Sequence, residues 1–221
     1  MTQKLELKIT KDGSHTLFNP AINETYHTLN GAIAEADYVY IQRGLKEITK
    51  SKKDISVFEL GFGTGLNAIL TIIDAIENNY NLTYHCIDSN ILEIGIIDKL
   101  NYFQFMDNQY RSLFHEIHKS QWNSELMLKE SITFKKINSK VEDYISDKQY
   151  DIIYFDAFAP SRQSEIWEDD IISKISEMLN DNGLIVTYSS TSKFSKQLKS
   201  RNLSVEKLPG FCKREMTRAW K

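Results

Sequence analysis

One stretch of the sequence decides the fold: Val57-Phe58-Glu59-Leu60-Gly61-Phe62-Gly63-Thr64-Gly65-Leu66-Asn67. An apolar run typical of a strand ends in an acidic residue, three alternating glycines follow, and a segment with helical character comes next. Glycine allows positive φ angles, and because it lacks a Cβ it lets a ligand approach the backbone closely. The stretch therefore predicts a strand, a tight turn and a helix, with a nucleotide-like ligand over the bare turn.

The spacing of these glycines separates two classes of nucleotide-binding enzyme. A dinucleotide fingerprint has the pattern G-x-G-x-x-G, in which the third glycine packs the helix against the strand. Here Leu66 occupies that third position, and the glycines run G-x-G-x-G. The pattern resembles motif I of Rossmann-like methyltransferases that bind S-adenosylmethionine. This resemblance implies that the cofactor is bound by Glu59, Gly61, Gly63, Gly65 and Asn67.

The composition is that of an ordinary globular protein, with 41% hydrophobic and 26% charged residues in 221. Its two cysteines, Cys86 and Cys212, have no C-x-x-C spacing, and its five histidines form no H-E-x-x-H pattern. We therefore expect no metal and no disulfide framework. No apolar run reaches membrane-spanning length and no signal-peptide core is evident, so we expect no membrane partner and a cytoplasmic location. The length suits a single methyltransferase domain over residues 1–221.

Charge is distributed unevenly along the chain. The net charge is −3, yet the segment from Ser190 to Lys221 holds nine basic residues and only two acidic ones. Such a segment can be a solvated helix face with strand ends, or a surface that follows a phosphate backbone beside an active site. Both readings remain open at this point.

Strand-like and helix-like segments alternate through most of the chain. Strands are predicted at 55–60, 83–87, 132–137, 150–155, 184–188, 203–208 and 214–220, with helices at 66–78, 169–179 and 191–199. A hairpin (5–9 and 15–18) and a helix (30–45, with Asn30 as N-cap and Gly44 near its end) precede them. An aromatic-rich segment at 92–129 is expected as a helical insert, about 90–130. The order predicts an α/β, Rossmann-like methyltransferase fold: a mostly parallel seven-stranded sheet with an antiparallel last strand.

Polar residues follow two of the predicted strands at their carboxyl ends, where open α/β sheets bind ligands. Asp88 lies 23 residues beyond Gly65, and its carboxylate can accept hydrogen bonds from ribose hydroxyls. Asn138 and Ser139 follow a later strand, and either can face the adenine edge. The alternatives are a helix N-cap for Asp88 and a strand-end turn for the other two.

A second strong signal is the segment Asp156-Ala157-Phe158-Ala159-Pro160, which follows a strand predicted to be buried. It resembles the acid-proline-proline-aromatic loop of amino-group methyltransferases. Asp156 can hold an N–H group of a neutral amine and take up its proton, beside the cofactor. Phe158 can stack on a flat base, and Pro160 stiffens the loop. The alternatives are an Asx-turn for Asp156 and a core position for Phe158.

Several blocks together resemble the MnmC-type tRNA methyltransferase domain. Gly61 to Asn67 matches its G-F-G-T-G-L-N, Asp156 to Pro160 its D-G/A-F-A-P, and Lys213-Arg214-Glu215-Met216 its K-R-E-M. Tyr26-His27 with Gly31 and Glu35 resembles an N-terminal block of the same family, so the resemblance covers about residues 15–221. The chain departs from the pattern at Asp88, where Glu is frequent, and near Ser139, where an Asp is common.

The resemblance implies an S-adenosyl-L-methionine-dependent enzyme that methylates 5-aminomethyl(-2-thio)uridine at the wobble position of tRNA. It implies catalytic roles for Asp156 and Phe158, with tRNA as the partner and no obligate protein partner. Since the sequence ends after the methyltransferase part, we expect no FAD. Substrate contacts are implied for Tyr26, Glu35, Phe158, Pro160, Lys213, Arg214 and Glu215.

Three alternatives stay open. A small-molecule amine methyltransferase would have the same fold and no RNA contact. An aminopropyltransferase of this fold usually needs extra acids along a polyamine channel, and the Asp156 loop offers one acid. A non-catalytic RNA-binding module would keep a nucleoside pocket without transferring a methyl group.

Overall fold

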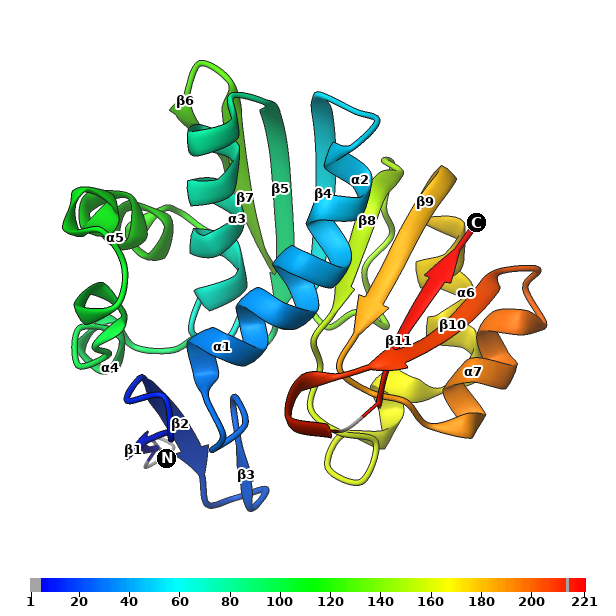
Figure 1. The fold of residues 1–221 in the computed structure, drawn as a ribbon, viewed down its shortest axis with the longest axis horizontal. Helices are drawn as coiled ribbons and strands as arrows, with labels where there is room; N and C mark the ends of the chain where they lie inside the picture. The colour runs from blue at the N-terminus through cyan, green and yellow to red at the C-terminus, as the bar shows by residue number, and fades with distance from the viewer. Residues whose placement is uncertain (1–4, 214) are drawn as a thin grey trace.

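The computed structural model describes residues 5–213 and 215–221, except for the side chain of Lys213. Five parallel strands form the centre of the main sheet (Figure 1): β4 (Asp54–Leu60), β5 (Asn81–Asp88), β7 (Ile132–Asn138), β8 (Tyr150–Phe155) and β9 (Leu179–Thr187). Every residue of β8 is buried, as expected for a parallel strand covered on both faces. Their carboxyl ends meet at one edge, which is where the glycine turn and Asp156 lie.

The end of the chain enters the sheet antiparallel, as predicted. Strand β10 (Ser204–Pro209) and strand β11 (Glu215–Trp220) are joined by a short turn, η5 (Phe211–Lys213). A turn this short cannot provide a parallel crossover. As a result, β11 lies between β9 and β10 and is antiparallel to both.

The expected helical insert is only partly helical. It contains α4 (Ile94–Ile97), η2 (Tyr102–Gln104), η3 (Asn108–Tyr110) and α5 (Arg111–Lys119), and then a strand, β6 (Glu125–Lys129), antiparallel to β7. Residues of β6 alternate between exposed and half-buried, which is the two-residue period of a strand. Over the described residues the sheet thus has eight strands rather than seven, in the order β10-β11-β9-β8-β4-β5-β7-β6. The predicted fold class is otherwise confirmed.

The N-terminal hairpin forms a small separate sheet from β1 (Glu6–Ile9), β2 (His15–Asn19) and β3 (Glu24–Thr25). Its turn caps the helix that follows. Ser14 Oγ accepts from the backbone N–H groups of Ala32 and Ile33, at 3.2 and 3.3 Å, and Asp12 Oδ2 from that of Ala34 at 3.1 Å. The prediction of Asn30 as N-cap was therefore wrong, because the cap comes from a distant turn.

The first helical segment is longer than predicted. It runs without a break through α1 (Ala32–Ala36), a π-helix η1 (Asp37–Leu45) and α2 (Lys46–Thr49). Gly44 does not end it. A Cβ at Gly44 would lie 2.9 Å from Val186 Cγ1 and 3.1 Å from Ile152 Cδ1, so the glycine lets the helix pack closely on the sheet.

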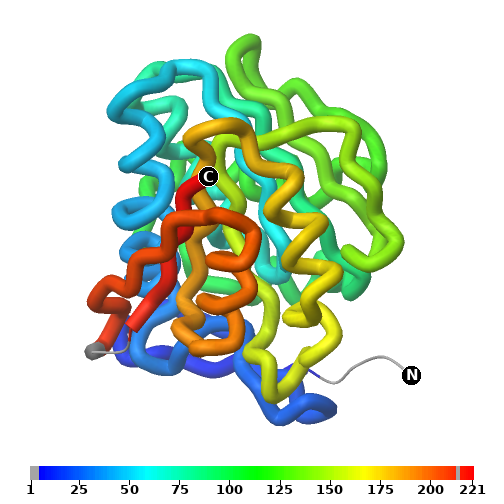
Figure 2. Tube along the Cα trace, turned by 90° about the vertical axis from the view of Figure 1, so that its right-hand side faces the viewer, coloured from blue at the N-terminus to red at the C-terminus, as the bar shows by residue number. Residues whose placement is uncertain are grey.

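Helices cover both faces of the sheet. The segment 32–49, α3 (Leu66–Asn78) and the insert pack on one face. The turn η4 (Ser164–Trp167), α6 (Asp169–Glu177) and α7 (Ser192–Lys199) pack on the other. Figures 1 and 2 both show the N-terminal sheet, in blue, at the end of the molecule where the parallel strands finish. Among the described residues, no helix is long and apolar enough to cross a membrane.

Candidate active site

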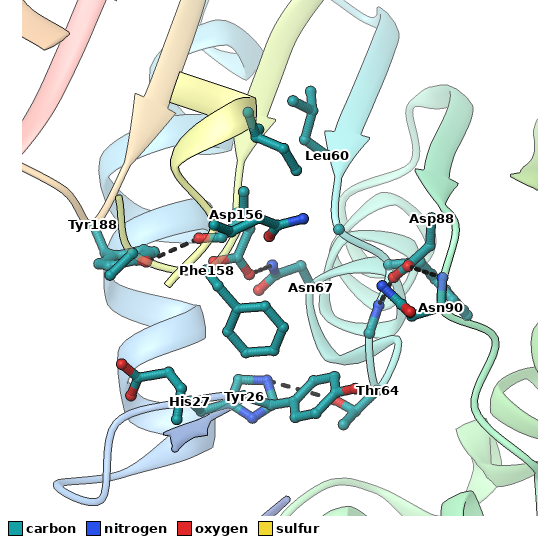
Figure 3. A pocket seen from close by; sticks show the side chains of 18 of the residues that line it. Tyr26, His27, Leu60, Thr64, Asn67, Asp88, Asn90, Asp156, Phe158 and Tyr188 are labelled. Atoms are coloured by element: carbon teal, nitrogen blue, oxygen red, sulfur yellow. Dashed lines mark hydrogen bonds between the residues drawn. The ribbon is translucent and has the colours of Figure 1, made fainter. Parts of the chain in front are cut away.

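A pocket of about 650 Å³ lies at the carboxyl ends of the parallel strands. Its walls come from the loops after β4, β5, β7 and β8, from the N-terminal sheet, and from α1 and η1 (Figure 3). Its size is within the range of small-molecule sites. The pocket thus brings together residues as far apart in the sequence as Glu24 and Tyr188.

Each of the three glycines in the turn after β4 is favoured at its position by a different structural feature. Gly61 has φ +87°, and a Cβ there would lie 2.6 Å from the backbone oxygen of Asp156. Gly63 has φ +49° and donates its N–H to Asp88 Oδ2 at 3.0 Å. Gly61 and Gly63 line the pocket, whereas Gly65, with φ +70°, precedes α3 and packs against His118 of the insert. The turn therefore brings bare backbone to the pocket wall.

Two side chains of the insert form hydrogen bonds with the glycine turn. His118 Nε2 pairs with the backbone oxygen of Thr64 at 3.1 Å, and the Tyr102 hydroxyl donates to Thr64 Oγ1 at 2.9 Å. Burial lowers the pKa of His118 to about 3, so the ring is neutral at physiological pH and its Nε2–H can donate to the carbonyl. The insert is thus attached to the middle of the glycine turn.

Asp88 lies beside the glycine turn at the end of β5. Its Oδ2 accepts from Gly63 N–H, and its Oδ1 accepts from the backbone N–H of Asn90 at 2.7 Å. Burial raises the pKa of this carboxyl, although the backbone hydrogen bonds lower it. A carboxylate can accept about four hydrogen bonds. The backbone N–H groups of Gly63, Ser89 and Asn90 supply three of them, so Asp88 can still accept from a hydroxyl in the pocket.

The structure separates the two candidates at the end of β7. Ser139 lines the pocket. Asn138 is exposed and lies outside the residues that line it, and its backbone N–H donates to Asn123 Oδ1 at 2.9 Å. Only Ser139 is therefore placed to contact a ligand there.

Asp156 is held by two side chains. Its Oδ1 accepts from the Tyr40 hydroxyl at 2.6 Å, and its Oδ2 accepts from Asn67 Nδ2 at 2.7 Å (Figure 3 shows Asn67 beside it). Burial raises the pKa of Asp156 to about 6, even though both hydrogen bonds act to lower it. The carboxylate is consequently fixed in place and titrates close to neutral pH.

Asn67 connects Asp156 to Glu59. Its Nδ2 also donates to Glu59 Oε1 at 3.0 Å, while its Oδ1 is buried without a hydrogen-bond partner among the described residues. Glu59 is only 1% exposed and does not line the pocket, and burial raises its pKa well above the usual value. The acid of the glycine motif therefore lies beneath the pocket, where it orients Asn67.

Aromatic rings form the opposite wall. The rings of Phe158 and Tyr26 meet edge to face, with centroids 5.1 Å apart. The backbone of the loop is fixed by Trp167 Nε1, which donates to Phe158 O at 2.9 Å, and by the Tyr188 hydroxyl, which donates to Ala157 O at 2.9 Å. Pro160 belongs to this loop but does not line the pocket. Phe158 is thus a wall residue of the site.

The pocket is strongly acidic. Among the described residues that line it, one lysine, Lys140, stands against six carboxylates: Glu24, Glu35, Asp88, Glu142, Asp156 and Glu165. His27 adds no positive charge, because burial lowers its pKa to about 4. Glu35 Oε2 also accepts from the backbone N–H of Thr28 at 2.9 Å. Such a lining favours a cationic ligand over a bare phosphate.

Of the three C-terminal candidates, only Glu215 is fully described, and it does not line the pocket. Glu215 is exposed and pairs with Lys207 at 3.6 Å. Arg214 and the side chain of Lys213 lie outside the described residues. Several basic residues of the segment 190–221 form ion pairs within the fold. These pairs are Arg201–Asp169, Lys193–Glu168, Arg218–Glu206 and Arg218–Glu47.

Tyr40 is the main site residue that sequence reasoning missed. It lies within the helix predicted over 30–45, and it is buried. The available signal was chemical: a buried tyrosine hydroxyl needs a hydrogen-bond partner. Nothing in the sequence shows that this partner is Asp156.

Comparisons with known proteins give a consistent result. A family model described as S-adenosyl-L-methionine-dependent methyltransferase matches residues 98–221. The chain is 28% identical over 214 residues to the tRNA 5-methylaminomethyl-2-thiouridine biosynthesis bifunctional protein MnmC of Campylobacter hominis, covering 92% of this chain and 31% of that protein. It is 27% identical over 200 residues to an uncharacterized protein of Methanocaldococcus jannaschii, covering 86% of this chain and 51% of that protein.

A similar fold is found among solved structures. MNMC2 from Aquifex aeolicus superposes with a TM-score of 0.82 at 24% identity, covering 98% of this chain and 70% of that one. The methyltransferase domain of the citrinin polyketide synthase, at 12% identity, has a TM-score of 0.53. This chain spans about a third of the length of its bifunctional relatives.

Proposed function

Since this chain belongs to the family of S-adenosyl-L-methionine-dependent methyltransferases, we propose that it methylates the amine of 5-aminomethyl(-2-thio)uridine at the tRNA wobble position. Three steps support this proposal: the fit of the cofactor, the chemistry of the acidic pocket, and the relatives.

The pocket fits S-adenosyl-L-methionine. Gly61 and Gly63 bring backbone without side chains to the pocket wall, and Asp88 can accept a hydrogen bond from a ribose hydroxyl at the end of β5. Ser139 lies where the adenine edge is expected. The cofactor supplies an electrophilic methyl carbon on a positively charged sulfur. We assign its binding to Gly61, Gly63, Asp88 and Ser139, with Asn67 held in place by Glu59.

The fixed Asp156 carboxylate is the observation that carries the choice of an amine. The amine nitrogen attacks the methyl carbon, the bond from that carbon to sulfur breaks, and the nitrogen gains the positive charge. Asp156 accepts an N–H hydrogen bond that aims the lone pair, and then takes up the proton that the new ammonium releases. The acidic lining stabilises this cation, and the rings of Phe158 and Tyr26 offer flat surfaces to a base.

The choice of tRNA depends on the relatives. The bifunctional MnmC proteins of Campylobacter and Burkholderia are described as acting in tRNA 5-methylaminomethyl-2-thiouridine biosynthesis, and this chain matches about a third of their length. Lys213, Arg214 and Glu215 would then contact the RNA outside the pocket.

The acidic lining also favours a second candidate. Six carboxylates suit a small-molecule amine, including a polyamine that accepts an aminopropyl group. The two candidates differ in the sulfonium donor that they consume and in the acceptor.

The test is incubation with methyl-labelled S-adenosyl-L-methionine and tRNA from cells that lack this protein, followed by nucleoside analysis. We expect label in 5-methylaminomethyl(-2-thio)uridine, with Asp156→Asn losing transfer while still binding tRNA. Label that appears only in a small amine, or consumption only of a decarboxylated donor, would contradict the tRNA proposal. Unchanged transfer by Asp156→Asn would contradict the role of this carboxylate.

A further inference from the structure

Tyr40 reaches the site from a part of the chain that carries no recognised motif. It lies in the π-helix η1, is 2% exposed, and packs its ring 5.1 Å from that of Tyr154. Its hydroxyl donates to Asp156 Oδ1 at 2.6 Å, across 116 positions of sequence. This short hydrogen bond to a carboxylate is of the strong, charge-assisted kind.

The packing of η1 on the sheet places this hydroxyl. Gly44, one turn after Tyr40, lies so close to Val186 and Ile152 that a Cβ would not fit. Helix η1 can therefore lie directly on β8 and β9, and Tyr40 reaches past the end of β8 to Asp156. Departures from α-helical geometry occur frequently at functional sites, and η1 is a π-helix over its nine residues.

Over the described part of the chain, the other ionisable groups around Asp156 and the Tyr40 hydroxyl are acids. Glu59 from β4, Glu35 from α1 and Tyr188 after β9 face Asp156 or the Tyr40 hydroxyl, and all three become negative when they ionise. The two hydrogen bonds to the carboxylate come from the neutral groups of Tyr40 and Asn67. Asn67 also donates a hydrogen bond to Glu59, so a change at Asn67 would affect two acids. A change at Tyr40 tests the hydrogen bond to Asp156 more selectively.

We infer that Tyr40 is a positioning residue, whose hydroxyl fixes Asp156 and stabilises its ionised form, and so sets the lower pH limit of the proposed methyl transfer. This inference rests on the proposed function for its catalytic meaning. Its effect on Asp156 can be measured without any substrate. Removing a hydrogen bond to a charged group should raise the pKa of Asp156 by about one to two units.

The first experiment compares Tyr40→Phe with Tyr154→Phe. Tyr154 is a matched control, because it is buried in the same layer and its hydroxyl pairs with Thr71 at 3.1 Å instead of Asp156. The carboxyl ¹³C signal of Asp156, assigned with Asp156→Asn, is followed by NMR during a pH titration. We expect an upward shift of about one to two units in Tyr40→Phe and none in Tyr154→Phe.

An unchanged titration in Tyr40→Phe, or equal shifts in both variants, would overturn the inference. Should Tyr40→Phe fail to fold, site-specific 3-fluorotyrosine at position 40 provides the opposite test. Its more acidic hydroxyl is a stronger donor and should lower the pKa of Asp156, and a rise or no change would overturn the inference.

The second experiment measures methyl transfer to tRNA between pH 5 and 9. The acidic break of kcat/KM should move upward in Tyr40→Phe by the same shift as the NMR titration, and stay in place in Tyr154→Phe. An NMR shift without a matching kinetic shift would overturn the link to catalysis. If tRNA is not methylated at all, the proposed function fails, while the NMR result still decides whether Tyr40 controls Asp156.

Discussion

Replacing Asp156 by Asn should stabilise the fold at neutral pH while it abolishes methyl transfer. Burial raises the pKa of this carboxyl in the folded protein to about 6, from an ordinary value of 3.8. Below about pH 4 the group is protonated in both the folded and the unfolded state. As the pH rises from about 4 to 6, the unfolded chain loses this proton before the folded chain does, so the wild type loses stability.

The size of the effect follows from the difference of about two pKa units. At 1.36 kcal/mol per unit, the ionised carboxylate costs the wild type about 3 kcal/mol above pH 6. The side-chain oxygen of the introduced Asn can still accept a hydrogen bond from the Tyr40 hydroxyl. Its NH₂ group, however, faces the NH₂ group of Asn67, which lowers the free energy of unfolding by about 1 kcal/mol. The variant should therefore gain about 2 kcal/mol at pH 8, or roughly 4–8 °C in Tm for a chain of this length.

The assay is urea and thermal unfolding of both proteins at several pH values between 4.5 and 8. Asp151→Asn is the matched control, five positions earlier and also buried. Burial raises the pKa of Asp151, but hydrogen bonds from Lys52, Ser56 and Asn180 outweigh this and lower it. Asp151 thus stabilises the wild type above its ordinary pKa of 3.8, and Asp151→Asn should lose stability by a constant amount between pH 4.5 and 8, because this contribution is lost only below pH 3.8.

Over this range the stability gain of Asp156→Asn should therefore grow as the pH rises to about 6, while the loss in Asp151→Asn stays constant. A stability difference between Asp156→Asn and wild type that stays constant, or shrinks as the pH rises, would refute the reasoning. Methyl transfer measured in parallel should be lost in Asp156→Asn at every pH.

Three further predictions concern the binding surfaces. Gly61→Ala forces a side chain into positive φ and against Asp156 O, so it should cost about 2–4 kcal/mol in urea unfolding and abolish calorimetric binding of S-adenosylhomocysteine. Asp88→Asn should weaken that binding roughly tenfold to a hundredfold through loss of charge-assisted hydrogen bonds, and unchanged affinity would remove Asp88 from the site. Replacing both Lys213 and Arg214 by Ala should reduce the slope of log K against log salt for tRNA binding by about 2, and an unchanged slope would exclude phosphate contacts at these positions.

The central elements could be predicted from the sequence because their signals are local. The glycine turn, Asp88 and Asp156 each follow directly after a strand, and parallel strands bring their carboxyl ends to one edge. The short turn after β10 likewise predicted the antiparallel last strand. Strand β6 was missed because its five alternating residues give only a weak strand signal at the end of a long aromatic-rich segment.

The function of the insert was decided by tertiary contacts. His118 and Tyr102 form hydrogen bonds with Thr64 in the glycine turn, although the sequence predicted only a helical insert in this segment. From the sequence, the neighbours Asn138 and Ser139 were equally good candidates for the adenine contact, yet of these two only Ser139 lines the pocket. Adjacent residues at a strand end point in different directions, and the sequence alone does not fix which one points inward.

By itself, then, the sequence determined the sheet, the bare turn and the two acids at its edge, since each depends on residues within a few positions of one another. The folded chain decided what surrounds Asp156. Its hydrogen bond from Tyr40 depends on how closely η1 packs on β8 and β9, and on the burial that raises its pKa. Both depend on contacts between segments that are far apart in the sequence, and no local sequence pattern shows such contacts.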